Sequence, residues 1–162
     1  MEHPEKNTIN AINELRDKYP YAASMLIFIL IERELKKYVI KHRFESSLQK
    51  EKVKIRCQYV SVRDLNKKDD ECFLKEFISK ITLGSVEKIL KIKKNDSPSK
   101  LRNELMHSKE YLLCEHLLEE QERIDKNREK YEQAKQYLIK VFQQYSDYAI
   151  VEKNDILSIE FK

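Results

Sequence analysis

Glycine, proline and tryptophan are nearly absent from this sequence. Its 162 residues include one glycine, three prolines and no tryptophan, whereas 37% are charged and 41% are hydrophobic. Because glycine and proline are the residues that most often interrupt helices, their scarcity favours an all-α fold. The hydrophobic fraction is too high for a disordered chain, and the length suits a single domain with its own core.

Cysteines and apolar runs are also limited. Cys57, Cys72 and Cys114 are odd in number and lack CxxC spacing, which argues against a disulfide framework and against a zinc site. The N-terminal EHPEKN does not resemble a signal peptide. The apolar run at residues 22–31 is ten residues long, whereas a membrane span needs about twenty. We therefore expect a soluble, cytoplasmic protein in which this run forms a buried helix.

The positive charge is concentrated in one segment. Residues 33–68 hold twelve Lys or Arg against four Asp or Glu, a net +8, so the rest of the chain carries −4 of the total +4. Such a segment suits a phosphate-backbone ligand, although a solvated lysine-rich surface explains it equally well. The candidate RNA-binding residues are Lys36, Lys37, Lys41 and Arg43.

The spacing of apolar residues predicts an all-α helical bundle. Helical periods or start signals occur at about residues 7–18, 21–43, 70–80, 85–94, 98–118 and 131–145. Asn7 or Thr8 is expected to cap the first helix, and Ser85 the helix that follows Gly84. The charged stretch at 119–130 either continues a helix or forms a polar connector.

Two segments depart from the helical pattern. Residues of about 44–68 form a basic, irregular insertion, either extended or a short strand pair. At the C-terminus, Leu157, Ile159 and Phe161 alternate with polar residues, which predicts a strand or terminal hairpin. We expect one domain over residues 1–162, with a core at about 7–146 and an extension at 147–162.

The segment SKLRNELMH, residues 99–107, combines a core stripe with a second face. On a helix, Leu101 and Leu105 fall on one side, whereas Arg102, Asn103 and His107 fall on the other with Met106, Leu113 and Leu117. A helix with two such faces needs a second partner, which in a small protein is often another copy of the chain.

The side chains of this second face suit phosphate chemistry. Arg102 provides a guanidinium for bidentate phosphate binding, and His107 provides an imidazole that exchanges protons near neutral pH. Asn103 lies one turn before His107, where its amide could orient the imidazole or contact phosphate. Together they suit metal-free RNA cleavage, in which two proton-transfer groups and a guanidinium act on one phosphodiester. Two copies of the motif across a two-fold axis would supply two imidazoles and two guanidiniums.

The motif RNELMH resembles the R-x4-6-H signature of the HEPN superfamily (higher eukaryotes and prokaryotes nucleotide-binding domain), in which a polar residue follows the arginine. The likeness covers about residues 7–146. It implies a bundle of four to five helices that dimerises with its motifs facing each other. It also implies a metal-independent endoribonuclease of toxin–antitoxin, abortive-infection or antiviral defence systems, with RNA as substrate, a possible antitoxin partner and no cofactor.

Several alternatives stay open. Some HEPN members have lost catalysis and bind nucleotide, RNA or protein, and a plain helical interaction protein is a third possibility. Arg102 could pair with Glu104 or Glu32, with His107 simply ending a helix. Glu32 is either a support for the motif or the partner of Lys36 one turn on. One HEPN subgroup carries a tyrosine two residues past the histidine; here that position is Lys109, and Tyr111 follows as a supporting candidate.

Overall fold

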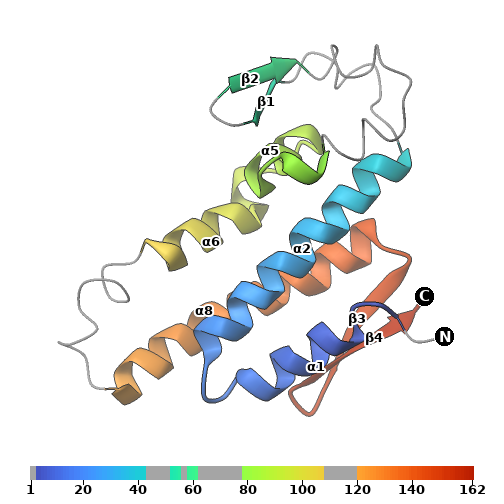
Figure 1. The fold of residues 1–162 in the computed structure, drawn as a ribbon. Coiled ribbons are helices and arrows are strands. Elements are labelled where there is room, and N and C mark those ends of the chain that lie inside the picture. Colours follow the sequence, from blue (N-terminus) through green and yellow to red (C-terminus); the bar gives the residue numbers. More distant parts are fainter. Residues whose placement is uncertain (1–2, 43–51, 56–57, 62–77, 108–119) are drawn as a thin grey trace. The chain divides into compact units, whose positions relative to one another are not determined.

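The computed structural model describes residues 3–42, 52–55, 58–61, 78–107 and 120–162. The described chain is mostly helical and ends in a two-stranded antiparallel hairpin, which confirms the predicted fold class (Figure 1). It divides into two compact units, Met1–Ile31 with Pro98–Lys162, and Glu32–Ser97. Most of the helix expected at residues 70–80 lies outside the described residues.

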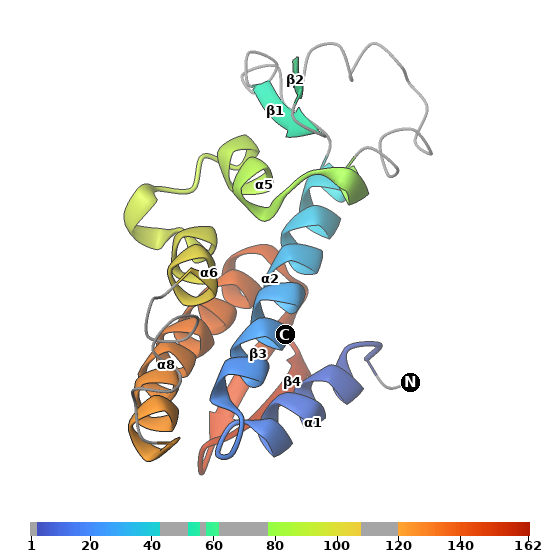
Figure 2. The ribbon, with the colours of Figure 1, turned by 60° about the vertical axis from the view of Figure 1, so that its left-hand side comes forward.

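The first unit contains α1 (Lys6–Leu15), the start of α2 (Pro20–His42), α6 (Pro98–Met106), α8 (Glu120–Tyr145), β3 (Tyr148–Lys153) and β4 (Ile156–Phe161). Helix α8 packs against β3, α1 against β4, and α6 against α8 (Figures 1 and 2). Because α8 already begins at Glu120, the charged stretch before Tyr131 continues as helix, which was one of the two predicted possibilities. The hairpin is therefore part of this unit's packing.

The core of the first unit is built from the predicted apolar stripes. The stripe predicted for α8 consists of Tyr131, Ala134, Leu138, Val141 and Tyr145. Its first four residues are buried, Tyr145 is half-buried, and Phe142 joins the buried set. The other buried apolar residues of this unit are Ile9, Ile12, Ala23, Ile27, Phe28, Leu30, Ile31, Leu101, Leu105, Ile150 and Leu157. The run at residues 22–31 thus forms a largely buried part of α2, in which Ile29 is exposed.

Helix α1 begins earlier than predicted. Its N-cap is Glu5, with no side-chain cap, so the prediction of Asn7 or Thr8 as the cap was wrong. The hydroxyl of Thr8 donates to Oε2 of Glu5 at 3.4 Å. Since α1 begins at Lys6, Thr8 lies inside the first turn, and its hydroxyl bonds back to the side chain of the N-cap residue Glu5.

The turn of the C-terminal hairpin explains why the chain reverses at residues 154 and 155. Lys153 pairs with Ile156, so the loop contains two residues. Both have positive φ, 51° for Asn154 and 63° for Asp155. Asparagine and aspartate tolerate this left-handed conformation better than most residues, and two-residue loops with this geometry match the twist of the strands.

The outer edge of β4 is occupied by one side chain of α1. Nδ2 of Asn13 donates to the carbonyl oxygen of Leu157, and Oδ1 of Asn13 accepts from the amide of Leu157, both at 2.8 Å. The amide thus reproduces the two hydrogen bonds that a neighbouring strand would make. Because a free strand edge is a site for unwanted pairing, this contact also protects β4.

We expect Asn13→Ala to lower the free energy of unfolding by about 2 kcal/mol, since it leaves a backbone donor and a backbone acceptor without their partner. Asn13→Asp should be no better, because its carboxylate faces the Leu157 carbonyl oxygen. The measurement is urea unfolding followed by circular dichroism, with the exposed Asn10→Ala of the same helix as control. Equal stability of the Asn13→Ala and Asn10→Ala proteins would contradict the role of this contact.

A buried lysine joins α8 to β3. Lys135 is 3% exposed, and its Nζ lies 2.5 Å from Oε2 of Glu132 and 2.6 Å from Oε2 of Glu152. Burial acts to lower the pKa of Lys135, but the hydrogen bonds and charges of the two glutamates outweigh it and raise the pKa above its usual 10.5. Lys135 therefore stays charged and ties the hairpin to the helix.

The hydroxyl of Tyr131, unlike the ammonium group of Lys135, is buried without a hydrogen-bond partner among the described residues. Burial raises the pKa of Tyr131 to about 12, against the lowering effect of the Lys135 and Arg16 charges. Burying a hydroxyl without a partner costs about 1–3 kcal/mol.

We expect Tyr131→Phe to raise the free energy of unfolding by about 1 kcal/mol at pH 8, since only the unsatisfied hydroxyl is lost. Between pH 10 and pH 12 the folded protein keeps a proton that the unfolded chain releases, so the wild type loses stability as pH rises. The stability gap between the two proteins should widen from pH 8 to pH 11 in urea titrations. A gap that stays constant or closes would refute the raised pKa.

The second unit contains the rest of α2, β1 (Lys52–Ile55), β2 (Gln58–Ser61), α5 (Leu83–Ile89) and the short 3-10 helix η2 (Lys94–Asp96). Strands β1 and β2 pair antiparallel, with Lys52 opposite Ser61, and α5 lies against β1. Within the basic insertion, residues 52–55 and 58–61 form the strand pair, one of the two forms expected, and the rest of the insertion lies outside the described residues. On α2, Leu35 and Val39 are buried as predicted.

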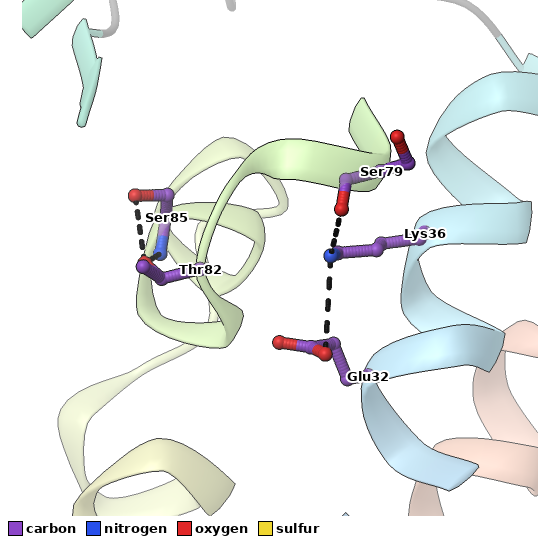
Figure 3. Close-up of polar contacts among 5 residues, drawn as sticks. All are labelled: Glu32, Lys36, Ser79, Thr82 and Ser85. Carbon is purple, nitrogen blue, oxygen red and sulfur yellow. Dashed lines mark hydrogen bonds and ion pairs between the residues drawn. The ribbon is translucent and has the colours of Figure 1, made fainter. Parts of the chain in front are cut away.

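The boundaries of α5 differ from the prediction. Thr82 is the N-cap, and its Oγ1 accepts from the amide of Ser85 at 3.2 Å, so the prediction of Ser85 as the cap was wrong (Figure 3). The helix ends at Ile89, where Lys91 has φ 55° and the amide of Ile92 donates to the carbonyl of Glu87. This is a Schellman motif, which stops the helix before the expected end at residue 94.

Candidate active site on helix α6

Helix α6 begins where the sequence predicts. Pro98 is its first residue, a position that suits proline because the first-turn amides have no intrahelical acceptor. Leu101 and Leu105 are buried, which confirms the predicted core stripe. Glu104 forms an ion pair of 3.8 Å with Lys130, and α6 packs against α8. One face of α6 thus packs against the rest of the first unit, mainly against α8.

The other face of α6 presents the motif. Asn103, Met106 and His107 are exposed, Met106 to 42%, and Arg102 is half-buried. The amide of His107 donates to the carbonyl oxygen of Asn103 at 3.0 Å, so the backbone remains helical up to the histidine. Asn103 and His107 therefore follow one another by one turn on the solvent side, with Met106 between them in the sequence.

Helix α6 ends at Met106. The continuation expected to about residue 118 falls on residues outside the described part of the chain, as do Tyr111, Leu113 and Leu117. The support by Tyr111, and the apolar face formed with Leu113 and Leu117, stay predictions. The exposed Met106 is the member of that face that the structure describes.

The two acids considered as partners of Arg102 each form an ion pair with a lysine. Glu104, one of the acids proposed for Arg102, is engaged by Lys130. Glu32 forms an ion pair with Lys36 at 3.8 Å, the alternative interpretation of this residue, as Figure 3 shows. Glu32 belongs to the second unit, and its support of Arg102 or His107 stays a prediction.

The candidate RNA-binding residues on α2 differ in how far their side chains are exposed. Lys36 has a side chain only 14% exposed, and its Nζ also donates to the carbonyl oxygen of Ser79 at 3.2 Å (Figure 3). Lys37 is 53% exposed and lies 3.7 Å from Glu34, and Lys41 is exposed. Arg43 lies outside the described residues. Lys36 thus serves the fold, whereas Lys37 and Lys41 remain at the surface.

Arg33 was not among the candidate residues, although the sequence carried a signal for it. It is exposed and precedes Lys37 and Lys41 at intervals of four residues. On a helix that spacing places all three cations along one side.

Comparison of the chain with protein-family models, with curated proteins and with solved structures gave no match. Among the described residues, no helix combines the length and the apolar character needed to cross a membrane. The same residues contain no group of three histidine, cysteine or acidic side chains placed to hold a metal ion.

Proposed function

We propose that this protein is a metal-independent endoribonuclease of the HEPN type, cytoplasmic and part of a prokaryotic defence or toxin–antitoxin system. The observation that carries the proposal is the solvent-facing side of α6. There His107 and Asn103 are exposed one turn apart, and Arg102 lies half-buried beside them. Phosphodiester cleavage has a use for each of these three polar groups.

In the proposed reaction the 2′-oxygen of a ribose attacks the adjacent phosphorus, and the bond from phosphorus to the 5′-oxygen breaks. One imidazole takes the proton of the 2′-hydroxyl, and a second group donates a proton to the leaving 5′-oxygen. Arg102 binds the non-bridging oxygens and stabilises the charge that gathers on them. The products carry a 2′,3′-cyclic phosphate and a 5′-hydroxyl.

One motif provides one imidazole, so the proposal includes a homodimer with two motifs at one composite site. The exposed Met106 supports this part, because a large apolar side chain between Asn103 and His107 suits a protein contact better than solvent. A C2 interface would bring the same face of both subunits together, and with it both histidines.

The test is incubation of the purified full chain with total RNA and with tRNA, in magnesium and in EDTA. We expect cleavage under both conditions, products with cyclic phosphate and 5′-hydroxyl ends, and a dimeric mass in size-exclusion chromatography with light scattering. Loss of activity in EDTA, or a purely monomeric active protein, would refute the mechanism. Absence of cleavage with retained RNA or nucleotide binding would point instead to a non-catalytic HEPN-like module.

A further inference from the structure

The second half of α2 carries a surface that the proposed active site does not use. Arg33, Lys37 and Lys41 are exposed and repeat every four residues, which places their charges about 6 Å apart along the helix axis. Beside this row, the rings of Tyr38 and His42 lie 4.2 Å apart between centroids and are tilted by 35°. His42 is exposed and Tyr38 is half-buried.

The cations and the rings lie next to each other on the helix. Counting about 100° per residue from Arg33, Lys37 and Lys41 fall at about 40° and 80°, and Tyr38 and His42 at about 140° and 180°. The five side chains therefore cover roughly half of the helix circumference. Within the same helix segment, Leu35 and Val39 are buried, and Lys36 is turned to Glu32 and Ser79.

We propose that this surface, formed by Arg33, Lys37, Tyr38, Lys41 and His42, binds single-stranded RNA. A row of cations follows a phosphate backbone, and the exposed ring of His42, backed by the half-buried ring of Tyr38, offers a face on which an unpaired base stacks. Duplex RNA hides the faces of its bases and would use only the cations. The choice of RNA as the ligand rests on the proposed function; the preference for single strands rests on the ring pair.

Charge and polarity favour a nucleic acid over a membrane surface. A helix that lies in a membrane interface needs large apolar side chains on its buried side. Among the described residues, the large hydrophobic side chains that are exposed are Tyr19, Ile29, Met106, Ile156 and Phe161, all outside the segment 32–42. The ion pair of Lys37 with Glu34 reduces but does not cancel the positive charge, because one carboxylate stands against the three cations of the row.

The test is binding by the full chain to a fluorescent 12-nucleotide single-stranded RNA, to a duplex of the same length and to phosphatidylserine vesicles. The row variant carries Arg33→Gln, Lys37→Gln and Lys41→Gln. Its control carries Lys93→Gln, Lys94→Gln and Lys153→Gln, which removes the same charge from exposed lysines outside α2. We expect the row variant, but not its control, to bind the single strand about tenfold more weakly. The slope of the logarithm of its binding constant against the logarithm of the salt concentration should be smaller in magnitude by about two, because fewer counterions are released.

The ring pair is tested separately. His42→Ala should weaken single-strand binding by about tenfold and leave duplex binding unchanged. Tyr38→Phe should preserve binding because it keeps the ring, whereas Tyr38→Ala should not. Thermal unfolding checks each variant, and His42→Ala, at an exposed position, decides the matter if Tyr38→Ala fails to fold.

The outcomes separate this inference from the proposed function. Equal losses in the row variant and its control, tighter binding to duplex, or binding to vesicles alone would overturn the inference. A row variant that cleaves RNA with unchanged KM would also overturn it while leaving the nuclease standing. A wild-type chain that does not cleave, yet binds single strands through α2, would retain the inference and reject the nuclease.

Discussion

Replacing His107 by alanine is expected to reduce RNA cleavage by a factor of about 10²–10⁴, to the limit of detection in an ordinary gel assay. The imidazole is the one group of the motif that can serve as a general acid or base in the proposed reaction, so no neighbour replaces it. Arg102→Ala should be equally damaging, and Arg102→Lys should restore little, because an ammonium cannot bind two phosphate oxygens in the planar bidentate way.

These variants should leave the fold intact. His107 is exposed and follows the last residue of α6, and Arg102 lies beside the stripe of Leu101 and Leu105, about 100° and 60° from them around the helix, and is half-buried. The matched control is Lys100→Gln, an exposed position on the same helix, which should cleave RNA like the wild type. Cleavage rates and melting temperatures are measured on the same preparations.

Two results would count against the proposal. A purified His107→Ala protein that cleaves RNA at the wild-type rate would remove the imidazole from the mechanism. A Lys100→Gln protein as inactive as His107→Ala would show that α6 is merely sensitive to substitution. The Asn103→Ala protein should cleave RNA at a rate between those of His107→Ala and Lys100→Gln, since an amide that orients the imidazole acts through the histidine.

Lys135→Met is expected to lower the free energy of unfolding by about 3 kcal/mol, the largest effect on stability that we expect from a single substitution. The Nζ atom of Lys135 neutralises Glu132 and Glu152 at the junction of α8 and β3. Removing the cation leaves Glu152, whose side chain is only 30% exposed, partly buried without its partner. Glu132 is 54% exposed and can turn to water, so the loss should come mainly from Glu152.

The double variant Lys135→Met with Glu152→Gln is the control for this prediction. Because it removes both charges across the junction, it should recover much of the lost stability. Urea unfolding of the wild type, both single variants and the double variant gives the coupling energy directly. A loss below about 1 kcal/mol in Lys135→Met would show that the cluster behaves like an exposed ion pair.

Much of the fold was predictable because its signals are local. The scarcity of glycine and proline indicated helices, and the four-residue and three-residue steps from Tyr131 to Val141 marked a buried stripe that the structure confirms. The alternation of Leu157, Ile159 and Phe161 predicted the terminal hairpin. Helix ends were predicted less well, since neighbouring polar residues compete for the cap, as Thr82 and Ser85 do.

The residues that join elements could not be predicted in this way. Lys135 lies four residues after Tyr131 and three before Leu138, on the buried side of α8, where a lysine needs a partner for its charge. Glu132 of the same helix is a local partner, whereas the second partner, Glu152, comes from β3 and depends on the tertiary structure. Asn13 gives no sequence signal, since an asparagine within a helix has no local reason to pair with a strand 144 residues away. Both contacts depend on elements brought together by folding.

For the candidate sites the division is similar. The sequence by itself determined which chemistry is available, because the guanidinium of Arg102, the amide of Asn103 and the imidazole of His107 are defined by residue type and helical spacing. The tertiary structure decided which side chains remain available for a ligand. It turned Lys36 toward Glu32 and Ser79 and left Lys37 exposed, since burial of one helix face fixes what its other faces present to solvent.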